Sequence, residues 1–442
     1  MKMRLLAATA AVSLFGTTAL ADPYAAFRGT TLTVSWPTLG HFNLAETVLE
    51  EFEQDTGINV EVEAIPYLQL RDRQITELSK PQGDLDLVSW VIMWKSEYVA
   101  NGLLTPLSQF FADSTLVDPD YAIEEIAGAY LVSGGVVGGA KGYLDGPGAG
   151  LYGVPYGAET SMLAYRTDIF EDNDIAVPQS YQDLTQAIDR LSELGIPAMT
   201  SRGKGGNDVT FAWLLHLGPL GGKIFDDRWE PQINSAEAVE AAEFLRRVVE
   251  TGPADIQNFN FGQSAFEFLS GGAAMYLDNI KIASAARDPS FSALNDKISY
   301  VKHPEGAACS AETGGFAIGI PANSQNQESA FLLLQYLTSK SGDQRIVDLG
   351  GDPIRIPTMF ANREARPEFG AVIDSLACAD EDWRPLIPEW NSIQNDIIGP
   401  ALLEVTRTDR PVQEIMDEAN VALRALMDDA GYYLWNAEAQ TQ

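Results

Sequence analysis

The sequence predicts an α/β fold of two lobes, and three observations support this prediction. Strand and helix patterns alternate between Thr31 and Leu107, as in a mostly parallel sheet covered by helices. The stretch 152–170 indicates two strands joined by a turn at Gly157, followed by a polar loop, and it connects this region to a second set of helices. A chain of 442 residues is long enough for two or three domains with their own cores.

The first α/β region carries local signals for each element. Asn43, with Glu46 three residues later, forms the capping-box pattern that predicts a helix start, and Gly57 is expected to end that helix. Alternating or buried apolar residues predict strands at 28–37, 58–65 and 86–92, and a second helix at 68–79. Because ligands of parallel sheets bind at the carboxyl ends of strands, we expect a site near Trp36, His41 and 90–94.

The second region begins with a helix that Ser180 caps. Two further capping boxes, Asn234 with Glu237 and Ser324 with Gln327, predict two more helix starts. A glycine-rich stretch at 133–150 predicts a surface loop. The remaining expected elements are helices at 263–269 and 411–430 and extended segments at 273–277, 297–302 and 314–321.

The N-terminus predicts a secretory signal peptide. Lys2 and Arg4 precede a short apolar run, and Ala19-Leu20-Ala21 fits a cleavage site after Ala21, which indicates export to the periplasm. Cleavage would remove two cations and no acid, and would move the net charge from −33 to −35. Such an acidic surface repels nucleic acid, so no nucleic-acid partner is expected.

The chain lacks the motifs of common catalytic and cofactor sites. Walker, G-x-S-x-G and H-E-x-x-H patterns are absent, and three scattered histidines and two cysteines do not have metal-site spacing. We therefore expect no metal, cofactor or catalytic residue. Export permits a disulfide between Cys309 and Cys378, although two buried thiols fit equally well; a disulfide would be expected to lie within one lobe.

Aromatic residues recur at predicted strand ends on both sides of the crossing at 152–170. Aromatic rings stack on the C–H faces of sugars, while adjacent polar groups bind the hydroxyls. Each ring alone could simply pack a core, and the recurrence is what favours a carbohydrate site. The residues concerned are Trp36, Trp90, Trp94, Tyr156, Trp213 and Phe316.

Three stretches, 84–107, 152–170 and 314–339, followed by GGDPIR at 350–355, resemble the family 1 extracellular solute-binding proteins of bacterial ABC importers. This group includes the maltodextrin-binding proteins. The resemblance implies a type II periplasmic-binding-protein fold, with each lobe a mostly parallel sheet flanked by helices. The implied lobes are 28–151 plus 305–350 and 152–304 plus 357–442, with hinge crossings near 152–158, 302–314 and 351–357.

The resemblance also implies a set of ligand-binding residues between the lobes. Asn43 could instead serve as a helix cap, and Arg355 could instead pair with Asp352 or Glu312. The sequence departs from the family pattern at Val91 and Asn279, so the usual sugar assignments do not transfer. The implied residues are Trp36, His41, Asn43, Trp90, Trp94, Tyr156, Glu159, Trp213, Asp278, Asn279, Gly314, Gly315, Phe316 and Arg355.

By this resemblance the protein is a monomeric periplasmic receptor. It binds a small carbohydrate or sugar alcohol, performs no chemistry and delivers its solute to an ABC permease. A secreted hydrolase using paired carboxylates is the alternative from another class. An anionic sugar derivative is the alternative ligand, and it would require Arg355 with a second cation such as His41 or Lys281.

Overall fold

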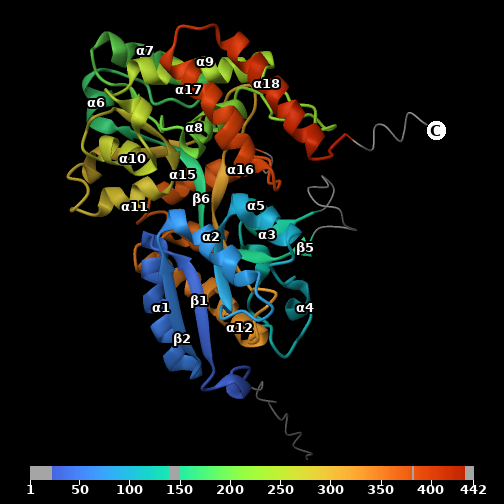
Figure 1. Ribbon diagram of the computed structural model, residues 1–442. Coiled ribbons are helices and arrows are strands. Elements are labelled where there is room, and N and C mark those ends of the chain that lie inside the picture. The colour runs from blue at the N-terminus through green and yellow to red at the C-terminus, as the bar shows by residue number, and fades with distance from the viewer. Residues whose placement is uncertain (1–21, 139–149, 381–382, 434–442) are drawn as a thin grey trace, which may run out of the picture.

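A single mixed sheet of eight strands runs through both lobes of the computed structural model, which describes residues 22–138, 150–380 and 383–433. The strand order is β2-β1-β3-β10-β6-β8-β7, and β9 also pairs with β6. The long strand β6 (Gly153–Arg166) passes from the first lobe into the second (Figure 1). The predicted signal peptide lies outside the described residues. Among the described residues, no helix combines the length and apolar character needed to cross a membrane.

The first lobe contains the predicted β-α-β-α-β order. Strand β1 (Thr31–Pro37) runs parallel to β2 (Asn59–Ile65) and β3 (Leu87–Val91), with helices α1 (Gly40–Thr56) and α2 (Tyr67–Leu78) between them. The parallel arrangement of these strands is therefore confirmed, and Gly57 ends α1 with a left-handed φ of 74°.

The capping box predicted at Asn43 is wrong. Helix α1 begins at Gly40, with Leu39 as N-cap and no side-chain cap, and the Asn43 backbone N–H already donates to the Leu39 carbonyl. The polar residue that resembled a cap lies inside the first turn of the helix.

Strand β6 is continuous where the sequence predicted a turn. Gly157 does have a positive φ of 77°, but it lies next to Ala158, the partner of Gly315 (φ 82°), at a register shift in the pairing of β6 with β10 (Thr313–Gly319). The left-handed glycines thus form an irregularity within the sheet and do not reverse the chain. A Cβ atom at Gly315 would collide with the Gly157 carbonyl oxygen, so glycine is required there.

The two halves of β6 have different partners. In the first lobe β6 pairs antiparallel with β10, and in the second it pairs antiparallel with β8 (Met275–Asn279) and β9 (Ile298–Lys302). The sheet is therefore parallel among β1–β3 and between β8 and β7 (Met199–Thr200), but antiparallel around the crossing strand.

Local signals located about half of the helices of the second lobe. Ser180 caps α7 (Tyr181–Glu193) in a complete capping box with Asp183. Helix α9 (Ala236–Thr251) is capped by Ser235 and not by Asn234, which donates to Asp417 instead. The stretch predicted as a loop after the crossing contains α6 (Thr167–Asp172). Other helices of this lobe are α8 (Asn207–Leu217), α10 (Phe261–Leu269), α11 (Lys281–Arg287), α17 (Gly399–Arg407) and α18 (Val412–Asp429).

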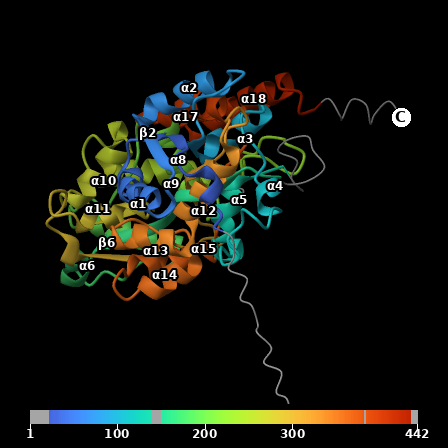
Figure 2. The ribbon, with the colours of Figure 1, turned by 90° about the horizontal axis from the view of Figure 1, so that it is seen from below.

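The chain crosses between the lobes again through α12 to α15, which lie together in the view from below (Figure 2). Helix α12 (Gln327–Thr338) starts without a side-chain cap, because the Ser324 hydroxyl donates to Asp86; that capping box was also wrong. The next helices are α13 (Lys340–Asp348), α14 (Ile356–Asn362) and α15 (Glu368–Leu376). Short elements complete the fold: α3 (Lys95–Ala100), α4 (Ser108–Phe111), α5 (Gly128–Gly135), β4 (Val136–Val137), β5 (Gly150–Leu151) and α16 (Trp390–Ser392).

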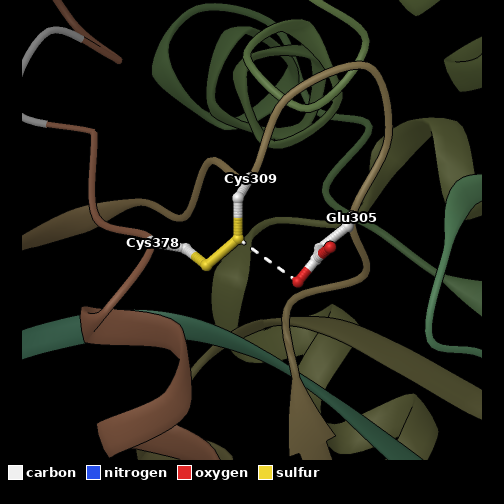
Figure 3. Close-up of side chains that lie close together, drawn as sticks. All are labelled: Glu305, Cys309 and Cys378. Carbon is white, nitrogen blue, oxygen red and sulfur yellow. Dashed lines mark hydrogen bonds between the residues drawn. A yellow bond between two sulfur atoms is a disulfide. The ribbon is translucent and has the colours of Figure 1, made fainter.

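Cys309 and Cys378 form a disulfide (Figure 3). It joins the connector between β9 and β10 to the residues that follow α15. The connector lies against the second lobe, because the Ala308 N–H donates to the Pro219 carbonyl and the His303 N–H donates to the Ser375 hydroxyl. The bond therefore does not span the two lobes.

Candidate functional site

Polar and aromatic side chains from both lobes are buried together beside β6 and β10. Electrostatic interactions connect them: the charges of Arg202 and Asp278 affect the pKa of Glu159, and the charge of Arg384 affects the pKa of Tyr67. The first lobe contributes rings and the second contributes most charges, so only the joined lobes complete the arrangement. We call the following residues the interlobe cluster: His41, Tyr67, Met93, Trp94, Tyr156, Glu159, Arg202, Phe211, Asp278, Asn279, Glu312, Phe316 and Arg384.

Arg202 and Asp278 form a buried ion pair on the second-lobe side. Arg202 Nε and Nη2 donate to the two Asp278 carboxylate oxygens at 2.7 and 2.6 Å. The guanidinium lies 3.8 Å from the ring centre of Phe211 and 4.6 Å from that of Phe261. Burial alone would lower the pKa of Arg202, but the adjacent carboxylate more than offsets this and raises it. The Asp278 carboxylate therefore already has a partner within the protein.

Glu159 and Asn279 connect the crossing strand to β8. The Asn279 amide donates to Glu159 Oε2 at 2.8 Å, and its oxygen accepts from the Lys281 backbone N–H at 3.1 Å. Burial raises the pKa of Glu159, while Lys281 and Arg202 act against this shift. Among the described residues no hydrogen bond involves the other oxygen of Glu159, so it can accept one from a ligand hydroxyl.

Arg384 and Glu312 carry polar atoms without partners. Both side chains are 3% exposed. Arg384 Nη1 lies 3.9 Å from Met93 Sδ, but neither Nε nor Nη2 of Arg384, nor Oε2 of Glu312, has a hydrogen-bond partner among the residues that the structure describes. Burial lowers the pKa of Arg384 to about 10, and burial next to Glu159 and Asp278 raises the pKa of Glu312 well above its usual value.

Buried polar atoms are rarely left unpaired, because each unmet hydrogen bond costs about 1–3 kcal/mol. Here several donors and acceptors occur in one interlobe region. Such an arrangement suits a ligand with many hydroxyl groups, which can donate and accept at once.

Stacked rings form the first-lobe side of the cluster. Tyr67 stacks on Trp94 with ring centres 5.6 Å apart and planes 15° from parallel, and Phe316 meets Tyr67 edge-on at 6.0 Å. Burial raises the pKa of Tyr67 to about 12, so its hydroxyl keeps its proton. These rings offer an apolar surface to the C–H groups of a sugar or polyol.

His41 and Tyr156 pack together beside the crossing. Their rings meet edge-on at 4.6 Å, and within the described part of the chain neither ring nitrogen of His41 nor the Tyr156 hydroxyl has a partner. Burial, with a smaller contribution from Lys281, lowers the pKa of His41 well below 6.5, so the imidazole is neutral. A neutral imidazole both donates and accepts a hydrogen bond.

Three predicted tryptophans lie in the lobe cores. Trp36 is fully buried against Phe42, with ring centres 5.5 Å apart. Trp90 Nε1 donates to the Gly134 carbonyl, and Trp213 Nε1 donates to the Ala238 carbonyl, both at 3.2 Å. These contacts support a packing role for each ring.

Arg355 and Asn43 also lie apart from the cluster. Arg355 donates to the carbonyls of Thr338 and Ala122, both at 2.9 Å, and pairs with Glu125 at 3.5 Å, so the expected pairing with Asp352 or Glu312 is wrong. Asn43 is exposed on α1.

Gly314 and Gly315 contribute through their backbone. Gly314 pairs with Glu159 in the sheet, and a Cβ atom on Gly314 would collide with the Glu312 carboxyl. The glycine therefore makes room for that buried carboxyl group.

Six cluster residues were missed from the sequence: Tyr67, Met93, Arg202, Phe211, Glu312 and Arg384. Tyr67 follows β2, so the strand-end rule could have identified it. Arg202 follows the two-residue strand β7, and Arg384 lies in an irregular segment, so no periodic pattern marked either residue.

A surface cavity of about 570 Å³ occurs elsewhere, in the first lobe near the start of α12, where Phe27, Phe110 and residues 324–329 line it. It shares no residue with the interlobe cluster. The buried polar groups of the cluster, and not this cavity, mark the candidate site.

Comparison with known proteins identifies the family. Residues 43–344 match the bacterial extracellular solute-binding protein family. The chain belongs to this family. It is 26% identical over 290 residues to a mannitol-binding protein of Pseudomonas aeruginosa, covering 64% of this chain and 62% of that protein. It is 23% identical over 327 residues to an erythritol/L-threitol-binding protein of Mycolicibacterium smegmatis, covering 70% and 67%.

Solved structures of two-lobed solute-binding proteins share the fold. An ABC transporter solute-binding protein from Agrobacterium radiobacter K84 in complex with ribitol has a TM-score of 0.78 and 25% identity, over 90% of this chain and 99% of that one. One from Agrobacterium vitis S4 with bound D-mannitol has a TM-score of 0.75 and 21% identity, over 91% and 99%. The predicted α/β two-lobed fold is thus confirmed.

Proposed function

We propose that the protein is a monomeric periplasmic receptor that binds a sugar alcohol or small sugar in the interlobe cluster and delivers it to an ABC import permease. It holds its solute without chemical change. The observation that carries this proposal is the set of buried, unpartnered polar atoms between the lobes, above all those of Arg384 and Glu312. The polyols named for its relatives support the same ligand class.

The charges of the cluster favour a neutral ligand. The cluster holds three acidic residues, Glu159, Asp278 and Glu312, against two arginines, and one of these arginines, Arg202, is already paired with Asp278. An anionic ligand would need an uncompensated cation. The cations named for that alternative do not supply one, because His41 is neutral and Lys281 pairs with Asp352 at 3.1 Å.

Lobe closure explains how such a receptor binds. Strands β6 and β10 connect the lobes, and the cluster is complete only when rings of the first lobe meet charges of the second. A ligand that contacts both sides therefore selects the closed arrangement.

The test is a thermal-shift and calorimetry screen of the mature protein against ribitol, D-mannitol, erythritol, maltose and mannitol 1-phosphate. A neutral polyol or sugar at a hundred times its Kd should raise the free energy of unfolding by about 2.7 kcal/mol. The phosphate ester should bind more weakly than its neutral parent.

A pair of variants locates the site. Arg384→Met should abolish the shift, whereas the matched control Arg190→Met, on the exposed surface of α7, should retain it. Equal binding by the two variants would remove Arg384 from the site, and the absence of any shift across the panel would refute a carbohydrate ligand.

A further inference from the structure

Three hydrogen bonds join Ala311 and Thr313, which follow Cys309, to Cys378, Asp380 and Trp383; we call this pairing the ladder. The disulfide lies at one end of the ladder, and the interlobe cluster lies at the other. Beyond Cys309, the Ala311 N–H donates to the Cys378 carbonyl at 3.0 Å, and the Asp380 N–H donates back to the Ala311 carbonyl at 3.1 Å. Further along, Trp383 Nε1 donates to the Thr313 carbonyl at 2.7 Å. The described residues of the two segments therefore lie side by side at Cys378–Asp380, next to the sulfur atoms, and again at Trp383, next to the cluster.

The ladder carries Glu312 and Arg384, two of the cluster residues whose polar atoms lack partners among the described residues. Glu312 lies three positions after Cys309, and Arg384 lies six positions after Cys378. The Glu312 backbone is also held by β6, because its carbonyl accepts from the Thr160 hydroxyl at 2.6 Å and its N–H donates to the Ser161 hydroxyl at 2.9 Å.

The segment of Arg384 has less support of its own. Its described residues, 377–380 and 383–389, belong to no helix and contribute only an isolated bridge, Ala311 with Ala379, to any sheet. Its other supports are the burial of Trp383, Leu386 and Ile387 in the core and the Ser96 hydroxyl, which donates to the Leu386 carbonyl. The disulfide and the ladder act together with this packing to fix where Arg384 lies.

We propose that the Cys309–Cys378 disulfide is a positioning element of the ligand site, which fixes the Arg384 segment against the Glu312 segment and so raises affinity for the solute. This inference rests on the proposed function. With the bond intact, the guanidinium is ordered before the ligand arrives. With the bond broken, the ligand must itself order that segment, which lowers affinity.

The bond is open to reduction. Cys309 is exposed and Cys378 is partly buried. A small dithiol would deliver two electrons and two protons, break the S–S bond, leave two cysteine thiols and itself become a disulfide. Glu305 Oε1 lies 3.4 Å from Cys309 Sγ. This group of one carboxylate and two sulfurs is no metal site while the sulfurs are joined.

The experiment compares the wild-type mature protein with the double variant Cys309→Ser/Cys378→Ser by calorimetry, using the polyol that binds the wild type best. The expected result is about tenfold weaker binding, since one loop and one long side chain must now be ordered on binding. Wild-type protein reduced with dithiothreitol should show the same loss, and reoxidation should restore affinity.

A matched control separates positioning from stability. Val248→Ala removes a fully buried side chain in α9 and lowers the stability of the same lobe without contacting the ladder. Its Kd should equal that of the wild type. An unchanged Kd in the double variant and in the reduced protein would overturn the proposal and leave the bond a purely stabilising role.

Hydrogen exchange gives a readout that needs no ligand. Breaking the bond should speed amide exchange in residues 383–389 while β8 keeps its protection. Unchanged exchange in 383–389 would refute positioning even if no polyol binds the wild-type protein. Failure of the proposed function and failure of this inference are therefore distinguishable.

Discussion

The buried Arg202–Asp278 pair should cost more stability when one partner is replaced than when both are. Each side chain is less than 10% exposed, and two hydrogen bonds of 2.7 and 2.6 Å join them. Asp278→Asn would leave the guanidinium buried against Phe211 without a counter-charge. Removing one partner of a buried pair typically costs about 3–5 kcal/mol, because the remaining charge is uncompensated.

The double variant Arg202→Met/Asp278→Asn removes both charges. The methionine retains most of the apolar contact with Phe211, which lies 3.8 Å from the guanidinium carbon. The double variant should therefore be more stable than either single variant. The resulting coupling energy should be about 2–3 kcal/mol, as for contacting residues in one network.

Urea denaturation of the four proteins, without ligand, measures this coupling. The matched control is the exposed pair Arg190–Glu193, at 3.4 Å, whose coupling should be below about 0.5 kcal/mol. Additive losses at Arg202 and Asp278 would refute the reasoning, because they would show that neither charge depends on the other for its burial.

Three further predictions concern a glycine, a histidine and an arginine outside the Arg202–Asp278 pair. Gly315→Ala should lower the free energy of unfolding, measured by urea denaturation, by about 1–3 kcal/mol, because φ is 82° and the new Cβ atom would collide with the Gly157 carbonyl oxygen. The control is Gly350→Ala, where φ is 99° and no atom lies within 4 Å of the new Cβ atom. It measures the cost of the positive φ alone and should lower the free energy of unfolding by less. The folded protein keeps His41 neutral, whereas in the unfolded chain this histidine takes up a proton near pH 6.5, so the free energy of unfolding should decrease as the pH is lowered. Between pH 7 and pH 5 the wild type should lose about 2 kcal/mol more of this free energy than His41→Gln. Arg355→Ala should lower stability by about 3 kcal/mol while the Kd for the polyol changes little; weaker binding at unchanged stability would return Arg355 to the site.

Several features that depend on neighbouring residues were predictable from the sequence, although the capping patterns at Asn43, Asn234 and Ser324 were misleading. The β-α-β order of the first lobe follows from hydrophobic periodicity, and the start of α7 follows from Ser180 and Asp183. The continuity of β6 was not predictable. A glycine with positive φ suits a turn and a sheet irregularity equally, and what decides between them is Gly315, which is far away in the sequence.

The candidate site likewise contains residues that the sequence could identify and residues that it could not. Strand ends drew attention to His41 and Trp94, which lie in the interlobe cluster. The same pattern also selected Trp90 and Trp213, because a ring at a strand end or in a helix looks alike whether it faces a core or a cleft. The carbonyls that accept from their indole nitrogens are identified only by the fold. Arg384 had no pattern at all, since its segment is irregular.

In the proposed receptor, recognition and closure share the same strands. Glu159 lies on β6, Phe316 lies on β10, and Glu312 directly precedes β10, so two of the segments that join the lobes also present groups to the ligand. The free energy gained by pairing those groups with hydroxyls is therefore available only in the closed form. The measured affinity is the intrinsic affinity reduced by the fraction of protein that is closed. Any change that favours closure should thus strengthen binding without touching the ligand. A substitution of Gly157 or Gly315, the positive-φ glycines where β6 pairs with β10, should act on affinity through the same equilibrium.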